Sequence, residues 1–259
     1  MRAADYAFFQ PRFIAMAHRG GYVDPAEADR ENTLYAFAEA MALGYTYLET
    51  DVHLTRDGVL VAFHDDHLDR LTEHTGRIAD ITLAELNRDR PDSLGRVPTL
   101  DELFEALPTA RFNIDMKADA TVAPLAAAIR AHQAEDRVCV ASFGQTRLRD
   151  FRRLAGPAVA TSASLPGVMW HMLPFLPDVH PGPAVALQVP LTRSLAGVPV
   201  HVFSPALVAR AHARGLRLQV WTIDDPDEMD RLIDAGVDGL VTNRIDVLKE
   251  VLVRRGLWL

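Results

Sequence analysis

Residues 17–21 read A-H-R-G-G, and residues 47–66 read Y-L-E-T-D-V-H-L-T-R-D-G-V-L-V-A-F-H-D-D. In both stretches charged side chains and a histidine follow a short apolar run, where a strand would end. In α/β proteins the carboxyl ends of parallel strands meet around one crevice. We therefore expect His18, His64 and their charged neighbours to lie together at one end of a sheet.

A β-hairpin is expected within the second stretch. The dipeptide Asp57-Gly58 stands between two alternating apolar arms, which is a strong hairpin signal. A two-residue turn at this dipeptide would pair Asp51 with His64, and a different turn would shift the register. The pattern thus predicts a hairpin arm over residues 59–63 that brings the second histidine beside the carboxylates.

The rest of the chain alternates apolar runs with segments of helical periodicity. Strands are expected at 13–17, 46–52, 111–116, 137–142, 158–162, 184–189, 216–222 and 238–242, with the arm at 59–63 as a ninth. Helices are expected near 34–43, 83–87, 100–106, 121–133, 145–154, 205–214 and 226–235. Such alternation predicts parallel strands with crossover helices.

We predict a (β/α)8 TIM barrel, a single domain over residues 1–259 with an irregular hairpin after the second strand. The length suits one such barrel, 49% of the residues are apolar, and no linker-like segment divides the chain. A doubly wound open sheet is the alternative, although the sequence lacks its glycine-rich nucleotide-binding signatures.

Composition also limits the partners and the compartment. The formal net charge of −8 argues against a dedicated nucleic-acid surface. Cys139 is the single cysteine and lies in an apolar run, so we expect a buried thiol and no intramolecular disulfide. The sequence contains neither a signal-peptide pattern nor an apolar run long enough for a transmembrane segment, and we expect a cytoplasmic protein.

Four polar side chains at strand ends suggest proton transfer and phosphate binding. His18 and His64 can exchange protons near neutral pH. Arg19 can bind phosphate bidentately, and Lys117 can hold it as a point charge. Taken alone, each histidine could instead be a structural residue, and Arg19 and Lys117 could each be an ordinary surface cation.

Three carboxylates are candidate metal ligands. Glu49 and Asp51 share one face of the second strand, and Asp115 ends a later strand. Oxygen ligands without cysteine favour Mg²⁺ or Ca²⁺ over a structural zinc ion. Together with the histidines, they predict metal-assisted cleavage of a phosphodiester. His53 has the same strand parity and is the remaining histidine expected nearest to the site.

An ordered set of short motifs resembles the glycerophosphodiester phosphodiesterases, metal-dependent barrel enzymes related to phosphatidylinositol-type phospholipases C. The matching pieces are H-R-G (18–20), E-N-T (31–33), E-x-D (49–51), T-x-D-G (55–58), H-D (64–65), I-T-L-A-E-L (81–86), P-T-L-D-E (98–102), N-I-D-M-K (113–117), S-F (142–143), V-W-T (220–222) and G-V-D-G-L-V-T-N (236–243). Each motif alone is weak, but the ordered set is specific and covers roughly residues 14–245.

The resemblance implies a site at the C-terminal mouth of the barrel. It implies that His18 and His64 are the acid–base pair and that the ring of Trp221 lines the substrate site, although an aromatic residue on a strand is equally typical of the core. The family usually has glutamate where this chain has Asp115, so a direct metal bond could become water-mediated. Glu31 could bind metal, substrate hydroxyls or Arg19, or could only stabilise a helix start.

The activity implied is hydrolysis of glycerophosphodiesters to glycerol 3-phosphate and an alcohol, through a cyclic phosphate. One alternative is a lysophospholipase D acting on lysophospholipids. The other is a catalytically silent barrel that binds phosphate esters. Retention of both histidines and of the E-x-D carboxylates argues against the silent barrel.

The apolar stretch 165–177 reads L-P-G-V-M-W-H-M-L-P-F-L-P and follows the strand at 158–162. Its three prolines oppose a long regular helix, so we expect a loop at the mouth. The loop could pack over the barrel or form a homodimer contact. It could also line an apolar wall, with Trp170 and Phe175, that holds an acyl chain or transiently touches a membrane surface.

Overall fold

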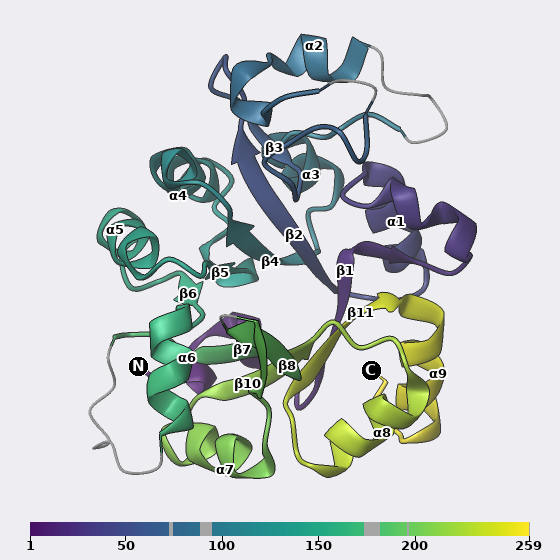
Figure 1. The fold of residues 1–259 in the computed structure, drawn as a ribbon, viewed down its shortest axis with the longest axis vertical. Coiled ribbons are helices and arrows are strands. Elements are labelled where there is room, and N and C mark those ends of the chain that lie inside the picture. The colour runs from purple at the N-terminus through teal and green to yellow at the C-terminus, as the bar shows by residue number, and fades with distance from the viewer. Residues whose placement is uncertain (73–74, 89–94, 174–181, 196, 259) are drawn as a thin grey trace.

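The computed structural model describes residues 1–72, 75–88, 95–173, 182–195 and 197–258, and within them eight parallel strands form a ring (Figure 1). The strands are β1 (Ile14–Tyr22), β2 (Tyr47–Leu54), β4 (Arg111–Met116), β5 (Val138–Ala141), β6 (Ala160–Thr161), β7 (Ala186–Pro190), β10 (Arg217–Trp221) and β11 (Gly239–Arg244). They pair in the order β6-β5-β4-β2-β1-β11-β10-β7, and a bridge between Ser162 and Ala186 joins the two ends. The predicted barrel is confirmed, and the open-sheet alternative is wrong.

Helices surround the ring, one after each barrel strand (Figure 1). They are α1 (Leu34–Ala42), α3 (Leu100–Ala106), α4 (Val122–Ala131), α5 (Gln145–Ala155), α6 (Leu165–Met172), α7 (Pro205–Ala213), α8 (Pro226–Asp234) and α9 (Ile245–Arg254). Thr33 caps α1 by accepting a hydrogen bond from Ala36 N, and Thr99 forms a capping box with Glu102. The main core lies between these helices and the outer face of the strands.

The N-terminal segment packs against the barrel interior. Its 3-10 turns η1 (Ala3–Asp5) and η2 (Ala7–Phe9) place Phe8 and Phe9 in a second apolar cluster that contains strand residues. Tyr47 Oη donates a 2.6 Å hydrogen bond to Phe8 O. Cys139 belongs to the same cluster and is fully buried, which confirms the expected buried thiol. Further 3-10 turns are η3 (Pro25–Arg30), η4 (Ile78–Asp80), η6 (Asp119–Thr121) and η7 (Glu135–Arg137).

The hairpin after β2 exists, but its predicted register is wrong by one residue. Strand β3 (Leu60–Ala62) pairs antiparallel with β2, and Phe63 N, not His64, faces Asp51 by donating to its carbonyl at 3.0 Å. The turn has three residues rather than two, because Gly58 adopts φ +79° after a tight turn that starts at Thr55. This arm and α2 (Leu83–Arg88), which lies at the top of Figure 1, contribute to a small apolar cluster of their own.

One prediction for the second half is corrected, and three elements there were not predicted. The stretch from Leu165 was expected to be a loop, yet α6 forms there because Pro166 occupies the first turn, where no backbone donor is lost, and Ser164 caps Gly167 N at 3.3 Å. A second hairpin, β8 (Thr192–Leu195) with β9 (Val198–His201), was not predicted, and neither was α9. Residues 174–181, which include Phe175, lie outside the described residues.

Candidate active site

A sharp turn of the chain creates the first half of the site. Strand β1 loses its regular register between Ala17 and Tyr22. Gly20 adopts φ +91°, and a Cβ placed there would lie 2.6 Å from the Cβ of Ala36 on α1. Only glycine allows this conformation and this close approach to the helix. The packing fixes the preceding pair, His18 and Arg19, at the C-terminal mouth of the barrel.

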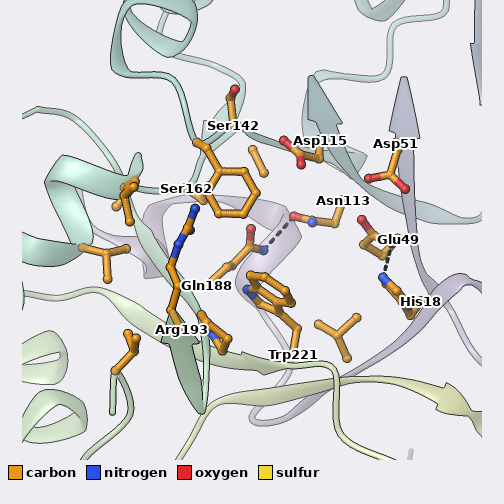
Figure 2. Close-up of a pocket in the computed structure, with 18 of the residues that line it drawn as sticks. His18, Glu49, Asp51, Asn113, Asp115, Ser142, Ser162, Gln188, Arg193 and Trp221 are labelled. Carbon is orange, nitrogen blue, oxygen red and sulfur yellow. Dashed lines mark hydrogen bonds and ion pairs between the residues drawn. The ribbon is translucent and has the colours of Figure 1, made fainter. Parts of the chain in front are cut away.

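A cavity of about 310 Å³ opens at this mouth (Figure 2). It brings together all eight predicted site residues: His18, Arg19, Glu49, Asp51, His64, Asp115, Lys117 and Trp221. They come from β1, β2, β4 and β10 and from the segments that follow β3 and β4. His64 reaches the cavity in spite of the wrong register, because the chain bends there after leaving β3.

His18 is oriented by a residue 225 positions away. Its Nδ1 lies 2.7 Å from Asn243 Oδ1, while Asn243 Nδ2 donates to Asp224 Oδ2 at 2.8 Å. Because Asp224 fixes the amide, Oδ1 is the acceptor, and His18 carries its proton on Nδ1 when neutral. The lone pair is then on Nε2, 3.8 Å from Glu49 Oε2. Burial and the neighbouring Arg19 lower the pKa of His18, which favours this neutral form.

His64 is held in the same way by a carboxylate. Its Nδ1 lies 2.5 Å from Asp65 Oδ1, and Arg70 Nε binds the other oxygen of Asp65 at 2.6 Å. Arg70 also pairs with Glu31 at 2.6 Å, and Glu31 pairs with Arg19 at 3.1 Å. A carboxylate on Nδ1 fixes the orientation of the ring and leaves Nε2 for the substrate. Of the roles open to Glu31, the structure shows the contact with Arg19; its side chain does not line the cavity.

Two cations hold the most buried carboxylate. Lys117 Nζ lies 2.8 Å from both Asp51 Oδ1 and Asp115 Oδ2, and Arg19 Nε lies 3.1 Å from Asp51 Oδ2. Burial alone would raise the pKa of Asp51, but Lys117 and Arg19 hold it below its usual range. Burial also opposes the charge of Lys117, and the two carboxylates nevertheless raise its pKa. Lys117 therefore stays charged, and Lys117 and Arg19 can both bind a phosphate.

The other two carboxylates, Glu49 and Asp115, have raised pKa values, whereas the pKa of Asp51 is lowered. Burial and the charge of Asp51 raise the pKa of Glu49 well above its usual range. Burial also raises the pKa of Asp115, against the effect of Lys117. Asp115 Oδ1 is buried and has no hydrogen-bond partner among the described residues. These two groups would gain from an additional positive charge in the cavity.

The carboxylates fit a hard divalent cation as part of its coordination shell. Among the residues that the structure describes, no three His, Cys, Asp or Glu side chains form a ready metal-binding group. Mg²⁺, however, commonly binds one or two carboxylates and completes its shell with water and substrate phosphate oxygens. Glu49, Asp51 and the unpaired oxygen of Asp115 can supply the carboxylate ligands of such a shell.

The far side of the cavity is apolar. Helix α6 and the residue after it contribute Leu165, Val168, Met169, Met172 and Leu173. The Phe143 and Trp221 rings meet edge to face with centroids 6.1 Å apart. Trp170, which was expected in this wall, is not among the residues that line the cavity, so that part of the prediction is wrong.

Several contributors were missed from sequence. Asn243 and Asp65 lie inside recognised motifs, but only the fold shows that they orient the two histidines. Gln188 donates to Asn113 Oδ1 at 2.7 Å across the cavity floor, and no pattern indicated this contact (Figure 2). His53 approaches as expected, with Nε2 3.1 Å from the carbonyl oxygen of His64.

A cavity that can bind phosphate and move protons, at the C-terminal mouth of a parallel barrel, places the protein among the barrel enzymes that act on phosphate esters. The model described as "Glycerophosphoryl diester phosphodiesterase family" matches residues 18–247. The chain belongs to this family, and the predicted phosphodiesterase class is confirmed.

Individual relatives agree over nearly the whole chain. The chain is 38% identical to the Mycobacterium tuberculosis protein named "Probable glycerophosphodiester phosphodiesterase 2", over 95% of this chain and 92% of that protein. It is 27% identical to human "Lysophospholipase D GDPD1", over 93% of this chain and 87% of that protein. An Oleispira antarctica phosphodiesterase solved with the product sn-glycerol-3-phosphate is 25% identical, with a TM-score of 0.75 over 93% of this chain and 96% of that structure.

Proposed function

We propose that the protein hydrolyses glycerophosphodiesters to glycerol 3-phosphate and an alcohol, with His18 and His64 as the acid–base pair. The observation that carries the proposal is the orientation of the two rings. Each has Nδ1 held by a partner and Nε2 left for substrate, in a cavity that also contains Arg19 and Lys117. The Oleispira antarctica relative was solved with sn-glycerol-3-phosphate, which is the product proposed here.

In the first step the neighbouring hydroxyl of the glycerol attacks phosphorus. His18 Nε2 takes the proton of that hydroxyl, because the lowered pKa keeps the ring neutral. His64, whose ring is oriented by Asp65, gives a proton to the departing alcohol oxygen. The new phosphorus–oxygen bond closes a cyclic phosphate as the bond to the alcohol breaks. Arg19 and Lys117 stabilise the negative charge that develops on the phosphate oxygens.

In the second step water opens the ring and the roles reverse. His64, now neutral, accepts a proton from the water, and His18 returns its proton to the glycerol oxygen. The product is glycerol 3-phosphate, and both histidines regain their starting states. A divalent cation held by Glu49, Asp51 and Asp115 would supply further charge neutralisation at the phosphate when bound.

Identification of the product tests this proposal. Glycerophosphocholine should release glycerol 3-phosphate, detected by coupling to glycerol-3-phosphate dehydrogenase, together with free choline. Glycerophosphoethanolamine and glycerophosphoinositol should give the same phosphate product. Release of phosphocholine, or no reaction with any diester, would contradict it, and the latter would favour the silent phosphate-binding barrel.

Asn243 should matter for turnover rather than for substrate binding. We expect Asn243→Ala to lower kcat by roughly 10- to 100-fold, the range for partners that orient functional rings, with KM little changed. The reason is that His18 loses the acceptor that fixes its proton on Nδ1. Nitrogen-15 NMR of the histidines should show the single tautomer of His18 becoming a mixture. An unchanged kcat would show that Asn243 is only structural.

Lysophospholipase D activity is a second candidate, and the apolar wall supports it. Helix α6 presents its apolar side chains to the same cavity as the histidines. Met169, Leu173 and Phe143 are about half exposed at the rim, at 46%, 53% and 44%. An acyl chain on the glycerol could cover this surface.

The test is a pair of rim substitutions. Met169→Gln with Leu173→Gln should raise KM for lysophosphatidylcholine roughly tenfold more than KM for glycerophosphocholine, because a buried side chain of this size contributes about 1.5–3 kcal/mol. Leu154→Gln is the matched control, since Leu154 is an exposed apolar residue on α5 outside the cavity. Equal effects on both substrates, or disruption of a dimer, would assign the rim a structural role.

Three further proposals rest on the sequence: a role in lipid metabolism, a cytoplasmic location, and transient contact of the apolar rim with a membrane surface. Among the described residues, no helix is both long and apolar enough to cross a bilayer.

A further inference from the structure

Arg193 lines the cavity, and in Figure 2 it lies on the side opposite His18. It belongs to β8 of the unpredicted hairpin, and Figure 2 shows its side chain rising along the cavity wall away from His18 and Glu49. The guanidinium carbon lies 4.7 Å from the centroid of the Phe143 ring. Phe143 therefore holds this cation at a defined place in the wall.

The charge of Arg193 is uncompensated within the described part of the chain. No carboxylate there forms an ion pair with it, whereas Arg19 and Lys117 both pair with Asp51. The residue is half-buried, and Val200 lies opposite it in the hairpin. A partly buried cation beside apolar side chains gains when an anion approaches, because charge-assisted hydrogen bonds replace lost hydration. In a chain of net charge −8, this cation is not part of a general basic surface.

The same arrangement disfavours a cationic alcohol group. A quaternary ammonium is usually bound on the faces of aromatic rings. Here the guanidinium of Arg193 already lies over Phe143, and the Phe143 ring also meets Trp221 edge to face. A choline group that approached the Phe143 ring would meet the like charge of Arg193.

We propose that Arg193 forms a second anion subsite, which selects diesters whose alcohol group carries its own phosphate or carboxylate. The proposal rests on the phosphodiesterase function proposed above. The glycerol and any acyl chain are uncharged, so only the alcohol group can supply this second charge. Arg19 and Lys117 bind the phosphate that reacts, and Arg193 binds the remote anion.

Glycerophosphoinositol and glycerophosphoinositol 4-phosphate, which differ by one phosphate, test the proposal. At low ionic strength the wild-type protein should show a KM roughly tenfold lower for the phosphorylated diester, the lower end of what a hydrogen bond to a charged group gives. Arg193→Gln should reduce this preference to within about twofold, and Arg193→Lys should retain most of it. Arg193→Gln should also lower KM for glycerophosphocholine, because the Phe143 face becomes free.

Arg149→Gln is the matched control, because Arg149 is an exposed arginine on α5 that does not line the cavity. It should leave the preference unchanged, and thermal unfolding should confirm that each variant is folded. A wild-type protein that cleaves both inositol diesters with equal KM would overturn the subsite, as would an equal loss of preference in Arg149→Gln. If the wild-type protein cleaves no diester at all, the proposed function itself fails.

Discussion

We expect His18→Ala and His64→Ala each to lower kcat for glycerophosphocholine by roughly 10² to 10⁴, the range for loss of a general acid or base. In the proposed mechanism each ring supplies the Nε2 that moves a proton to or from an oxygen on phosphorus. Steady-state kinetics with glycerol 3-phosphate detection measures the effect.

The variants should remain folded, because both rings lie at the mouth of the barrel rather than in its apolar core. His132→Ala is a matched control. His132 also pairs with a carboxylate, Asp101 at 2.9 Å, but lies outside the cavity. Near wild-type turnover in either His18→Ala or His64→Ala would remove that residue from the acid–base pair.

The second large effect concerns the cation. We expect excess chelator to abolish hydrolysis and Mg²⁺ or Ca²⁺ to restore it. Glu49→Gln and Asp51→Asn should lower kcat by at least about 10², because several kcal/mol of charge stabilisation at the phosphate depends on the cation. Both should also raise the metal concentration needed for half-maximal activity, measured by titrating metal into chelated protein.

Asp51→Asn should in addition lower stability, because Lys117 and Arg19 each lose a buried partner. Among the described residues, Glu49 forms no ion pair with a lysine or arginine side chain. Glu49→Gln therefore separates the effect on the metal from an effect on folding. Full activity in excess chelator would contradict metal dependence. Lys117, which lies between Asp51 and Asp115, and Arg19 would then neutralise the phosphate charge without a cation.

The parts of the fold that were predictable have local causes. Apolar runs that end in polar residues located the barrel strands, and helical spacing located most of the helices. The register of the β2–β3 hairpin failed because Gly58 can end a three-residue turn as readily as a two-residue one. Helix α6 was missed because Pro166 opposes a helix interior but not a first turn.

The site also contains residues that the sequence predicts and residues that only the fold brings together. Side chains that follow strands, such as His18, Asp51 and Lys117, were predictable because parallel strands gather their ends at one mouth. The contact of Asn243 with His18 joins residues 225 positions apart, and only the closed barrel determines it. The position of Arg193 likewise depends on a short hairpin that contains a proline at 199, which weakens a strand signal.

The central claim is that the two histidines act in two steps through a cyclic phosphate. The most direct test is to supply glycerol 1,2-cyclic phosphate and follow it by phosphorus-31 NMR. The wild-type protein should open the ring to glycerol 3-phosphate at least as fast as it turns over glycerophosphocholine, and His18→Ala and His64→Ala should lose both reactions. A wild-type protein that cleaves glycerophosphocholine but leaves the cyclic phosphate intact would contradict the two-step account.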